Sequence, residues 1–360
     1  MSAAEVKVSK AFILQNPPLA EIDLTLGSET STFKLVEQDI PELKEGQFLV
    51  KTAYLSNDPA QRTWIQRDAD AARGYIPPVR QGDIMNAIAI GKVVDSKSSN
   101  YSVGDLVLGL FRWREHSVQD EKPAAGLPVT KINAIPGIHP SIFLGAFGTT
   151  GLTAFFGLTD ILKLEKGQSI VISGAAGAVG SIAVQFAKHV IGASKVVAIS
   201  GTEEKVQWLK KLGADVSLNY KHPEFKKQLD DATEGFVDAY FDNVGGEILD
   251  HMLTRVKQHG RIAACGAISV YNSLDSTHLP NYAQIITNRL ILQGFIVIDY
   301  LPRYAEGIAA LSSALQAGKL DVKDGETLVQ AKFEDIPKTW GILFEGGNTG
   351  KLVTQIASLD

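Results

Sequence analysis

Three glycines, each three residues after the last, follow a short apolar run in the middle of the chain. The apolar run covers residues 170–172, and an apolar stripe at helical spacing covers residues 180–190. In a strand–turn–helix unit with this spacing, the first glycine allows the tight turn and the second lets the backbone approach a pyrophosphate. The third lets the helix pack closely on the strand, and the helix amides then face the phosphates. The segment therefore predicts a dinucleotide site formed by Gly174, Gly177, Ala178, Val179 and Gly180.

The length of the chain predicts more than one domain. Its 360 residues exceed the roughly 250–300 at which single hydrophobic cores stop growing. The net charge is −5 and no basic run stands out, so nothing indicates nucleic-acid binding. The first residues lack the apolar core of a signal peptide, and no apolar stretch is long enough to span a bilayer. A single cysteine, Cys265, excludes an internal disulfide and suits a reducing compartment, so we expect a cytoplasmic protein without a membrane partner.

The secondary-structure signals change near residue 148. Residues 1–140 show alternating stretches, such as 47–55 and 87–94, between turn clusters, and we expect them to be mainly β. From residue 148, strands alternate with helices, which is typical of a doubly wound parallel sheet. The predicted strands are 170–173, 195–200, 216–219, 239–242, 261–265 and 290–297, and the predicted helices include 180–190, 203–212 and 247–256. Beyond residue 299, a helix over 304–317 and a strand over 351–357 are expected to return to the first domain.

Several separated blocks of sequence resemble one family. The most specific block is Cys265-Gly-Ala-Ile-Ser-Val-Tyr-Asn272. The other blocks are at residues 55–59, 151–158, 174–180, 204–205, 212–214, 219–221, 241–246, 260–261 and 347–351. Over nearly its whole length the chain resembles the medium-chain dehydrogenase/reductase superfamily, and within it the zinc-free branch of leukotriene hydroxydehydrogenases, prostaglandin reductases and alkenal double-bond reductases. The resemblance implies an α/β architecture with a GroES-like catalytic β domain at 1–140, a Rossmann domain at 141–305 and a carboxyl-terminal return to the catalytic domain at 306–360.

The end of the second predicted Rossmann strand bears on the choice of nicotinamide cofactor. NAD sites usually place an Asp or Glu there, about 20 residues after the glycines, to hold the ribose diol. This strand ends instead at Ser200, and Glu203 and Glu204 follow at the expected start of a helix. Ser200, Lys205 and Tyr220 supply the cation and hydroxyls that a ribose 2′-phosphate requires, and the resemblance implies that Lys205 and Tyr220 contact it. The sequence therefore predicts NADP(H); the alternative for Lys205 is an ordinary solvated helix lysine.

The chain offers few ligands for a catalytic metal. Zinc alcohol dehydrogenases of this superfamily use cysteine and histidine ligands, whereas this chain has one cysteine, and its seven histidines lack ligand spacing. We therefore expect no metal site. A C=C bond that is activated by a conjugated carbonyl is easier to reduce without a Lewis acid, so the predicted substrate is a small hydrophobic enal or enone. A quinone reductase and a non-catalytic NADP-binding protein are the alternative interpretations.

Tyr271 is the predicted catalytic residue. Hydride transfer to the β-carbon of an enone builds negative charge on the carbonyl oxygen, and a donor that meets this charge accelerates the step. Tyr271 follows strand 261–265, where a parallel sheet opens its ligand crevice. The resemblance implies a tyrosine at the substrate here, sharing the task with a cofactor ribose hydroxyl, while the α-carbon takes its proton from a weak acid or water. Alternatively, Tyr271 only stacks on the cofactor.

Further cofactor contacts are expected from other loops at the same edge of the sheet. Asn243 follows strand 239–242 and is placed to bond ribose or amide groups, and Asn348 is the expected return of the carboxyl-terminal segment to the cofactor phosphates. The other residues expected to line the cofactor are Cys265, Gly266, Ala267, Ile268, Tyr271, Phe295, Ile296 and Val297. Polar residues after strands also form plain turns, and apolar strand ends also form plain core, so these alternatives stay open.

The substrate side departs from the resembled branch. Relatives commonly carry Asp-Pro-Tyr-Met-Arg where this chain has Ala60 and Gln61, and Thr149 replaces a bulkier or cyclic residue, so the substrate is poorly defined. Candidates either for an apolar lining or for core positions are Trp64, Tyr75, Trp113 and Phe147. Relatives often form homodimers through sheet edges, and the apolar stretch 290–297 fits either such an edge or a central strand.

Overall fold

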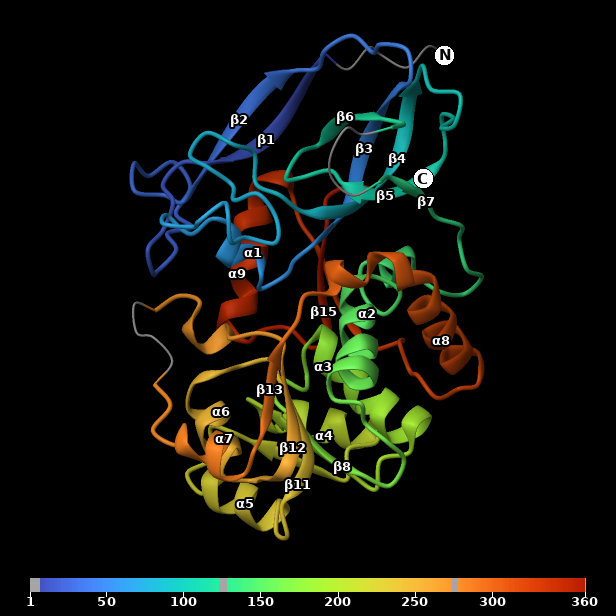
Figure 1. The fold of residues 1–360 in the computed structure, drawn as a ribbon. Helices are drawn as coiled ribbons and strands as arrows, with labels where there is room; N and C mark the ends of the chain where they lie inside the picture. Colours follow the sequence, from blue (N-terminus) through green and yellow to red (C-terminus); the bar gives the residue numbers. More distant parts are fainter. Residues whose placement is uncertain (1–6, 123–127, 274–277, 360) are drawn as a thin grey trace. The chain divides into compact units, whose positions relative to one another are not determined.

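The computed structural model describes residues 7–122, 128–273 and 278–359 (Figure 1). The first six residues, for which the sequence predicts no signal peptide, lie outside this range. The chain forms two compact units. The first unit runs up to Leu144 and includes Leu328–Gly347 and the residues from Leu352 onward, and the second comprises Gly145–Thr327 and Asn348–Lys351.

Antiparallel strands build the first unit. The long strand β3 (Gln47–Ser56) pairs with β4 (Ile88–Ser96), β6 (His116–Asp120) and β15 (Lys351–Gln355). The sheet has the order β14-β15-β3-β4-β5-β7, and β1 pairs separately with β2. The bounds of the remaining elements are β1 Val8–Leu14, β2 Phe33–Asp39, β5 Leu106–Leu110, β7 Thr130–Lys131, β14 Glu326–Gln330, α1 Gln61–Trp64 and α9 Ile336–Glu345. The predicted alternating stretches 47–55 and 87–94 correspond to β3 and β4.

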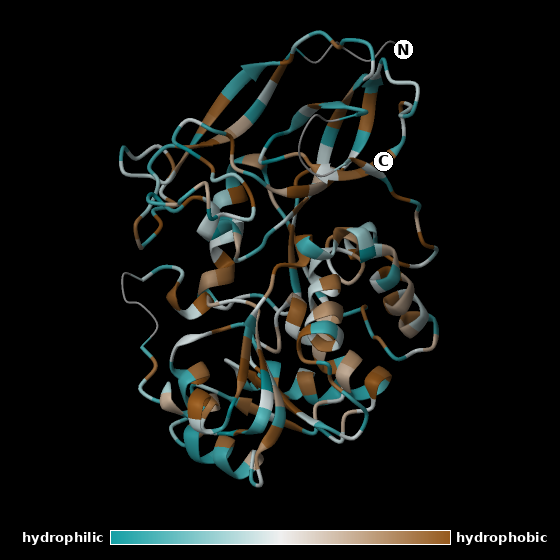
Figure 2. Cartoon of the chain, in the orientation of Figure 1, coloured by the Kyte–Doolittle hydropathy of each residue, from teal (hydrophilic) through white to brown (hydrophobic). Residues whose placement is uncertain are grey.

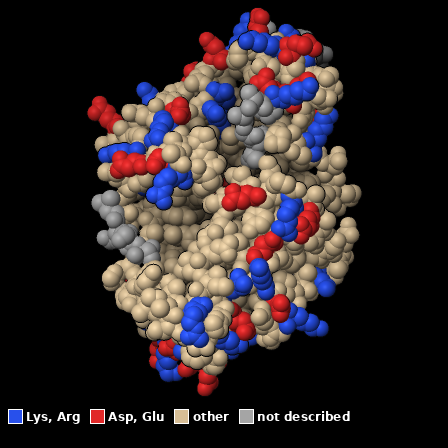
Figure 3. All heavy atoms as spheres, in the orientation of Figure 1, with Lys and Arg blue, Asp and Glu red and all other residues tan. Residues whose placement is uncertain are grey.

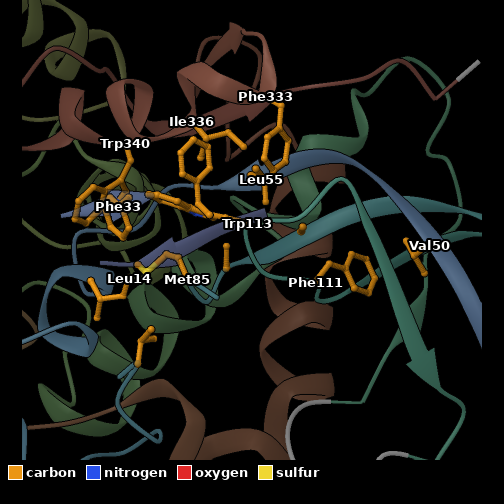
Figure 4. Packing of buried hydrophobic residues seen from close by; sticks show 14 of the residues in the cluster. Leu14, Phe33, Val50, Leu55, Met85, Phe111, Trp113, Phe333, Ile336 and Trp340 are labelled. Atoms are coloured by element: carbon orange, nitrogen blue, oxygen red, sulfur yellow. The ribbon is translucent and has the colours of Figure 1, made fainter. Parts of the chain in front are cut away.

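Aromatic rings fill the core of the first unit (Figure 4). The ring centroids of Phe33 and Trp113 are 4.7 Å apart, and those of Trp113 and Trp340 are 5.8 Å apart. The sequence left open whether Trp113 lines a substrate pocket or belongs to the core. Its side chain is 0% exposed, so it is a core residue. Trp340 lies in α9, and its burial against these rings therefore fixes the carboxyl-terminal helix to the core of this unit.

A six-stranded parallel sheet forms the centre of the second unit. Its strand order is β10-β9-β8-β11-β12-β13, and every neighbouring pair is parallel. The strands are β8 Ser169–Ile172, β9 Lys195–Ser200, β10 Val216–Asn219, β11 Val237–Asp242, β12 Val256–Ala264 and β13 Ile291–Gly294. The helices between and around them are α2 Thr149–Phe156, α3 Ala178–Gln185, α4 Glu203–Lys211, α5 Phe225–Ala232, α6 Gly246–Leu253, α7 Ala283–Thr287 and α8 Tyr304–Gln316. This order confirms the predicted doubly wound parallel sheet.

The strand order reverses between β8 and β11. The chain builds outward from β8 through β9 to β10, then crosses back to β11 on the other side of β8. In doubly wound sheets the ligand crevice opens at this reversal, outside the carboxyl ends of the strands. The glycine-rich turn follows β8 and Asn243 follows β11, so both lie at the position where the fold places its ligand site.

Two predicted elements end earlier than expected. The predicted strand 290–297 stops at Gly294, because its neighbour β12 ends at Ala264, the register partner of Gly294, and offers no further ladder partner. Phe295 and Ile296 therefore lie beyond the strand, and Val297 begins a 3₁₀ helix. The predicted helix 247–256 ends at Leu253, and Val256 instead begins β12 beside Val237.

The helix α8 belongs to the second unit, contrary to the predicted boundary at residue 306. Its buried face, which includes Gly307, Leu311 and Ala314, packs against α2. The segment of the first unit that follows begins only at Leu328. An amphipathic helix carries no sequence signal for the unit that it covers, so the sequence could not set this boundary.

Candidate cofactor-binding and catalytic site

The glycine-rich turn between β8 and α3 leaves no room for side chains at two positions. Gly174 has a φ of 56°, in the left-handed region that glycine adopts without steric cost. A Cβ on Gly180 would lie 2.5 Å from the carbonyl oxygen of Gly174 and 2.6 Å from Cα of Ala175. The first turn of α3 therefore presses directly on the backbone of the turn, as the third glycine of the motif predicts.

The start of α3 has no side-chain cap. Its N-cap, Gly177, has no side chain that could accept from the first-turn amides, and Ala178 and Val179 are half-buried. These amides carry the positive end of the helix dipole. The segment containing Asn348 lies against the same turn, because the amide of Gly350 donates to the carbonyl of Ala176 at 2.8 Å. The Asn348 side-chain amide itself donates to the carbonyl of Gly350 at 2.8 Å.

A buried hydroxyl and two basic side chains lie close together at the tip of β9. Ser200 is 4% exposed, and its hydroxyl has no hydrogen-bond partner within the described part of the chain. The ring of Tyr220 lies against Gly201, where an added Cβ would come within 3.2 Å of its hydroxyl. Lys205 is half-buried, and burial together with the Lys221 ammonium lowers the pKa of its side chain. A buried hydroxyl and two neighbouring ammonium groups fit a phosphate, which would relieve both the unmade hydrogen bond and the repulsion.

The acidic residues next to this position are held by the start of α4. Thr202 caps the helix by accepting from the amide of Lys205 at 3.3 Å. The carboxylate of Glu203 accepts from the Asn219 side chain at 2.9 Å. Hydrogen bonds to its own amide and to Thr202 lower the pKa of Glu204. Both acids are exposed residues of the first helical turn, and the strand itself ends at Ser200 without a carboxylate, as the sequence predicts.

Tyr271 follows a short 3₁₀ turn, Ile268–Val270, in the loop after β12. Its hydroxyl oxygen accepts a hydrogen bond from the amide of Ala267 at 3.1 Å. The side chain is half-buried and lies over the backbone of Gly266, where an added Cβ would be 3.4 Å from the hydroxyl oxygen. An amide that donates to a phenol oxygen stabilises negative charge on it, which makes the phenol a stronger hydrogen-bond donor.

The remaining predicted contacts lie in the loops after β11, β12 and β13. Asn243 donates from its side chain to the carbonyl of Ser173 at 2.8 Å, so it joins its own loop to the glycine-rich turn. Burial and the Asp242 carboxylate raise the pKa of Cys265 to about 12, so its thiol stays protonated at neutral pH. Phe295 packs edge-on against Phe241, at 6.2 Å between ring centroids, just past the end of β13.

The chain is similar to known proteins both in its separate domains and over most of its length. Residues 26–127 match the model described as the N-terminal domain of oxidoreductase, and residues 178–313 match the model described as zinc-binding dehydrogenase. The chain is 37% identical over 332 residues to prostaglandin reductase 1 of Bos taurus, covering 90% of this chain and 94% of that protein. The chain belongs to the medium-chain dehydrogenase/reductase superfamily. It is a member of the zinc-free branch that contains the prostaglandin and alkenal reductases.

Two further relatives match nearly the whole length of this chain. One is the protein of Saccharomyces cerevisiae named uncharacterized membrane protein YML131W, 35% identical over 364 residues that cover 97% of this chain and 98% of the relative. The other is CurA from Vibrio vulnificus, solved in complex with NADPH, with a TM-score of 0.85 and 32% identity over 97% of this chain and 99% of that chain. NADP(H) is therefore the cofactor of this oxidoreductase, as the tip of β9 predicts.

The described residues contain neither a metal cluster nor a membrane-spanning helix. No group of three or more His, Cys, Asp or Glu side chains among residues 7–122, 128–273 and 278–359 is arranged to hold a metal ion. Within the same ranges, every helix is too short or too polar to cross a bilayer. On the face in Figure 3, residues of both charges are interspersed, with no extended basic surface.

Four further residues near this site were not predicted from the sequence: Ser173, Tyr240, Asp242 and Lys221. The first three form a buried hydrogen-bonded cluster between the loops after β8 and β11. A signal was present, since Asp242 directly follows Ala239, Tyr240 and Phe241 at the end of a predicted strand, where an unpaired carboxylate would be costly. Lys221 adjoins the predicted Tyr220, but only the fold brings its charge near Lys205.

Proposed function

We propose that this NADP-dependent oxidoreductase reduces the C=C bond of α,β-unsaturated aldehydes or ketones. The observation that carries the proposal is Tyr271, whose phenol lies at the carboxyl edge of the parallel sheet and accepts from the amide of Ala267. The similarity of the whole chain to prostaglandin reductase 1, over most of both chains, supports the same class of reaction. This reaction does not require a metal ion, because the conjugated carbonyl already activates the double bond for hydride addition.

The cofactor is held by groups with matching charge. The amides of the glycine-rich turn and the start of α3, at Gly174, Gly177, Ala178, Val179 and Gly180, bind the pyrophosphate. The 2′-phosphate is bound by Ser200, Lys205 and Tyr220. Asn243 binds a ribose or amide group, Asn348 adjoins the phosphates, and the nicotinamide is lined by Cys265, Gly266, Ala267, Ile268, Phe295, Ile296 and Val297.

Tyr271 provides the charge stabilisation for the reaction. Bound NADPH supplies the hydride that adds to the β-carbon. The Tyr271 hydroxyl donates to the substrate carbonyl oxygen, where negative charge develops, and the Ala267 amide keeps its own donation to the phenol oxygen throughout. Removing one such donor from an enzyme typically lowers turnover by about 10²- to 10³-fold. The α-carbon receives its proton from a weak acid or water.

The first test is NADPH oxidation by the purified protein in the presence of a medium-chain trans-2-alkenal. The proposal predicts a saturated aldehyde, identified by mass and NMR. An allylic alcohol would instead mean carbonyl reduction and would overturn the proposal. Turnover of quinones without turnover of enals or enones would favour the quinone reductase, and tight NADPH binding without any turnover would favour the non-catalytic protein.

We also propose that this reductase is a cytoplasmic homodimer that pairs through β13. This strand is the edge of the parallel sheet, and Figure 2 shows hydrophobic positions along it in brown. Its Ile291 and Leu292 are 40% and 37% exposed. An unpaired edge that carries apolar side chains is a template for a second strand. Light scattering should give twice the mass of the chain, and Leu292→Lys should give a monomer; a monomeric unmodified chain would contradict the dimer.

A further inference from the structure

A single buried carboxylate joins the three loops that meet at the carboxyl edge of the parallel sheet. Asp242 is the last residue of β11 and is 1% exposed. Its Oδ1 accepts from the amides of Val244 at 3.0 Å and Gly245 at 2.9 Å. The Tyr240 hydroxyl lies 2.8 Å from the same oxygen, and the Ser173 hydroxyl donates to it at 3.1 Å. One carboxylate oxygen therefore organises the whole turn after β11.

The same cluster reaches the glycine-rich turn through Ser173. Its Oγ accepts from the amide of Asn243 at 3.1 Å, and its carbonyl accepts from the Asn243 side chain at 2.8 Å. Ser173 immediately precedes Gly174, so these bonds set the distance between the turn that faces the pyrophosphate and Asn243. Displacement of the Ser173 or the Tyr240 hydroxyl would therefore shift the glycine-rich turn and the loop after β11 together.

The main chain of Asp242 extends the connection to the third loop. Its carbonyl accepts from the amides of Cys265 at 2.8 Å and Gly266 at 3.1 Å. These residues begin the loop that ends at Tyr271. The loops after β8, β11 and β12 are therefore held in one arrangement by hydrogen bonds that converge on a single residue.

The burial of a carboxylate at this place is costly in itself. Burial raises the pKa of Asp242, and only the converging hydrogen bonds oppose that shift. Buried ionic groups can often be replaced by apolar residues without loss of stability, so stability alone gives no reason for an acid here. A carboxylate at this position is useful if the loops must be held in one geometry. Hydrogen bonds to a charged acceptor are about twice as strong as hydrogen bonds between neutral groups.

We propose that Asp242 is a positioning residue for cofactor binding, acting through Ser173 and the loops that it joins. It does not touch the cofactor itself; it holds Asn243 and the glycine-rich turn at the spacing that the nicotinamide half of NADPH and its pyrophosphate require. The inference rests on the proposed contacts of these loops with the cofactor. It does not depend on which substrate is reduced.

The test measures cofactor binding without substrate. Calorimetric titrations with NADPH and with 2′-AMP are made on the unmodified protein and on Asp242→Asn, which keeps an acceptor oxygen and nearly the same volume but removes the charge. Ser173→Ala is the second variant, so the test remains valid if the first fails to fold. The control is Ser217→Ala, which removes a buried hydroxyl from β10 of the same sheet that has no partner within the described residues.

We expect both cluster variants to weaken NADPH binding by at least about tenfold, the equivalent of one hydrogen bond to a charged group. Binding of 2′-AMP should stay within twofold, because its phosphate reaches only the tip of β9, at Ser200 and Lys205. The control should bind both ligands normally. Unchanged NADPH affinity in the cluster variants would overturn the proposal, and so would an equal loss for both ligands, which indicates general destabilisation. If the protein fails to reduce enals while these binding results hold, the proposed function fails and the positioning role stands.

Discussion

Replacing Gly180 by alanine sets two physical effects against each other. Alanine is favoured over glycine inside a helix by about 1 kcal/mol, so helix propensity alone predicts a more stable protein. The added Cβ would, however, lie 2.5 Å from the Gly174 carbonyl oxygen and 2.6 Å from Cα of Ala175. Carbon atoms pack best at about 3.5–4.0 Å, so the methyl group would intrude by about 1 Å.

The turn that meets this methyl group is anchored and cannot easily move away. The amide of Ala175 donates to the carbonyl of Ile199 at 2.9 Å, and the amide of Gly177 donates to that of Gly174 at 3.0 Å. Overpacking of this kind costs about 1–3 kcal/mol and exceeds the gain in propensity. After the gain in propensity of about 1 kcal/mol is subtracted, we expect a net loss of up to about 2 kcal/mol. For a unit of this size, 1 kcal/mol lowers Tm by about 2–4 °C, so Tm should fall by several degrees.

A matched substitution in α9 separates the two effects. At Gly341 the atom that an added Cβ would meet is Cδ1 of Leu24, at 2.6 Å, which is the end of a side chain that can rotate. Gly341→Ala should therefore leave Tm unchanged or raise it, whereas Gly180→Ala should lower Tm and weaken NADPH binding about tenfold. Thermal unfolding and NADPH titration measure both quantities. A more stable Gly180→Ala protein with normal NADPH affinity would refute the close approach of α3 to the turn.

Three further predictions concern single side chains of the site. Lys205→Ala should weaken NADPH binding about 10- to 100-fold, the equivalent of a hydrogen bond to a charged group, and leave NADH binding unchanged; equal effects on the two cofactors would contradict a 2′-phosphate contact. Tyr271→Phe should lower kcat for an enal about 10²- to 10³-fold at unchanged NADPH affinity, and undiminished turnover would exclude Tyr271 as the essential donor. Cys265, with its pKa of about 12, should be only about one part in ten thousand thiolate at pH 8 and react slowly with iodoacetamide; labelling as fast as that of a free thiol would show the thiol to be accessible and ionised.

The strands of the parallel sheet were predictable because burial on both faces leaves an apolar run between polar turns. The predicted strands 195–200 and 216–219 coincide with β9 and β10, and the glycine spacing marked the start of α3 within two residues. The missing carboxylate after β9 likewise indicated NADP(H), because the chemistry of that position depends on a few adjacent residues. Local signals are sufficient where the physical constraint is itself local.

Structural features that depend on a distant segment of the chain could not be predicted from the sequence. The strand β13 stops at Gly294 because β12 ends at Ala264, a partner 30 residues earlier in the chain. The cluster around Asp242 joins residues about 70 positions apart, since Ser173 and Asp242 meet only when β8 and β11 become neighbours. Neither feature has a signature within a window of sequence, although Asp242, which directly follows Tyr240 and Phe241 in a predicted strand, could have been recognised as an acid in need of partners.

The helices α3, α4 and α6 follow β8, β9 and β11, and they differ in which groups accept hydrogen bonds from the amides at their amino-terminal ends. This difference favours one helix start over the other two as a position for an anionic ligand. The start of α4 is capped by the Thr202 side chain, and the amides of Val244 and Gly245 ahead of α6 donate to the Asp242 carboxylate. The start of α3 follows Gly177, which has no side chain to offer. An anion that approaches this edge of the sheet would have to displace a protein acceptor at α4 or α6, but at α3 it meets amides that lack a side-chain cap. Under the proposed binding mode, Gly177 after β8 favours a phosphate at α3 by leaving its first amides without a side-chain cap. Asp242 at the end of β11 acts in the same direction, because it already accepts from the amides ahead of α6.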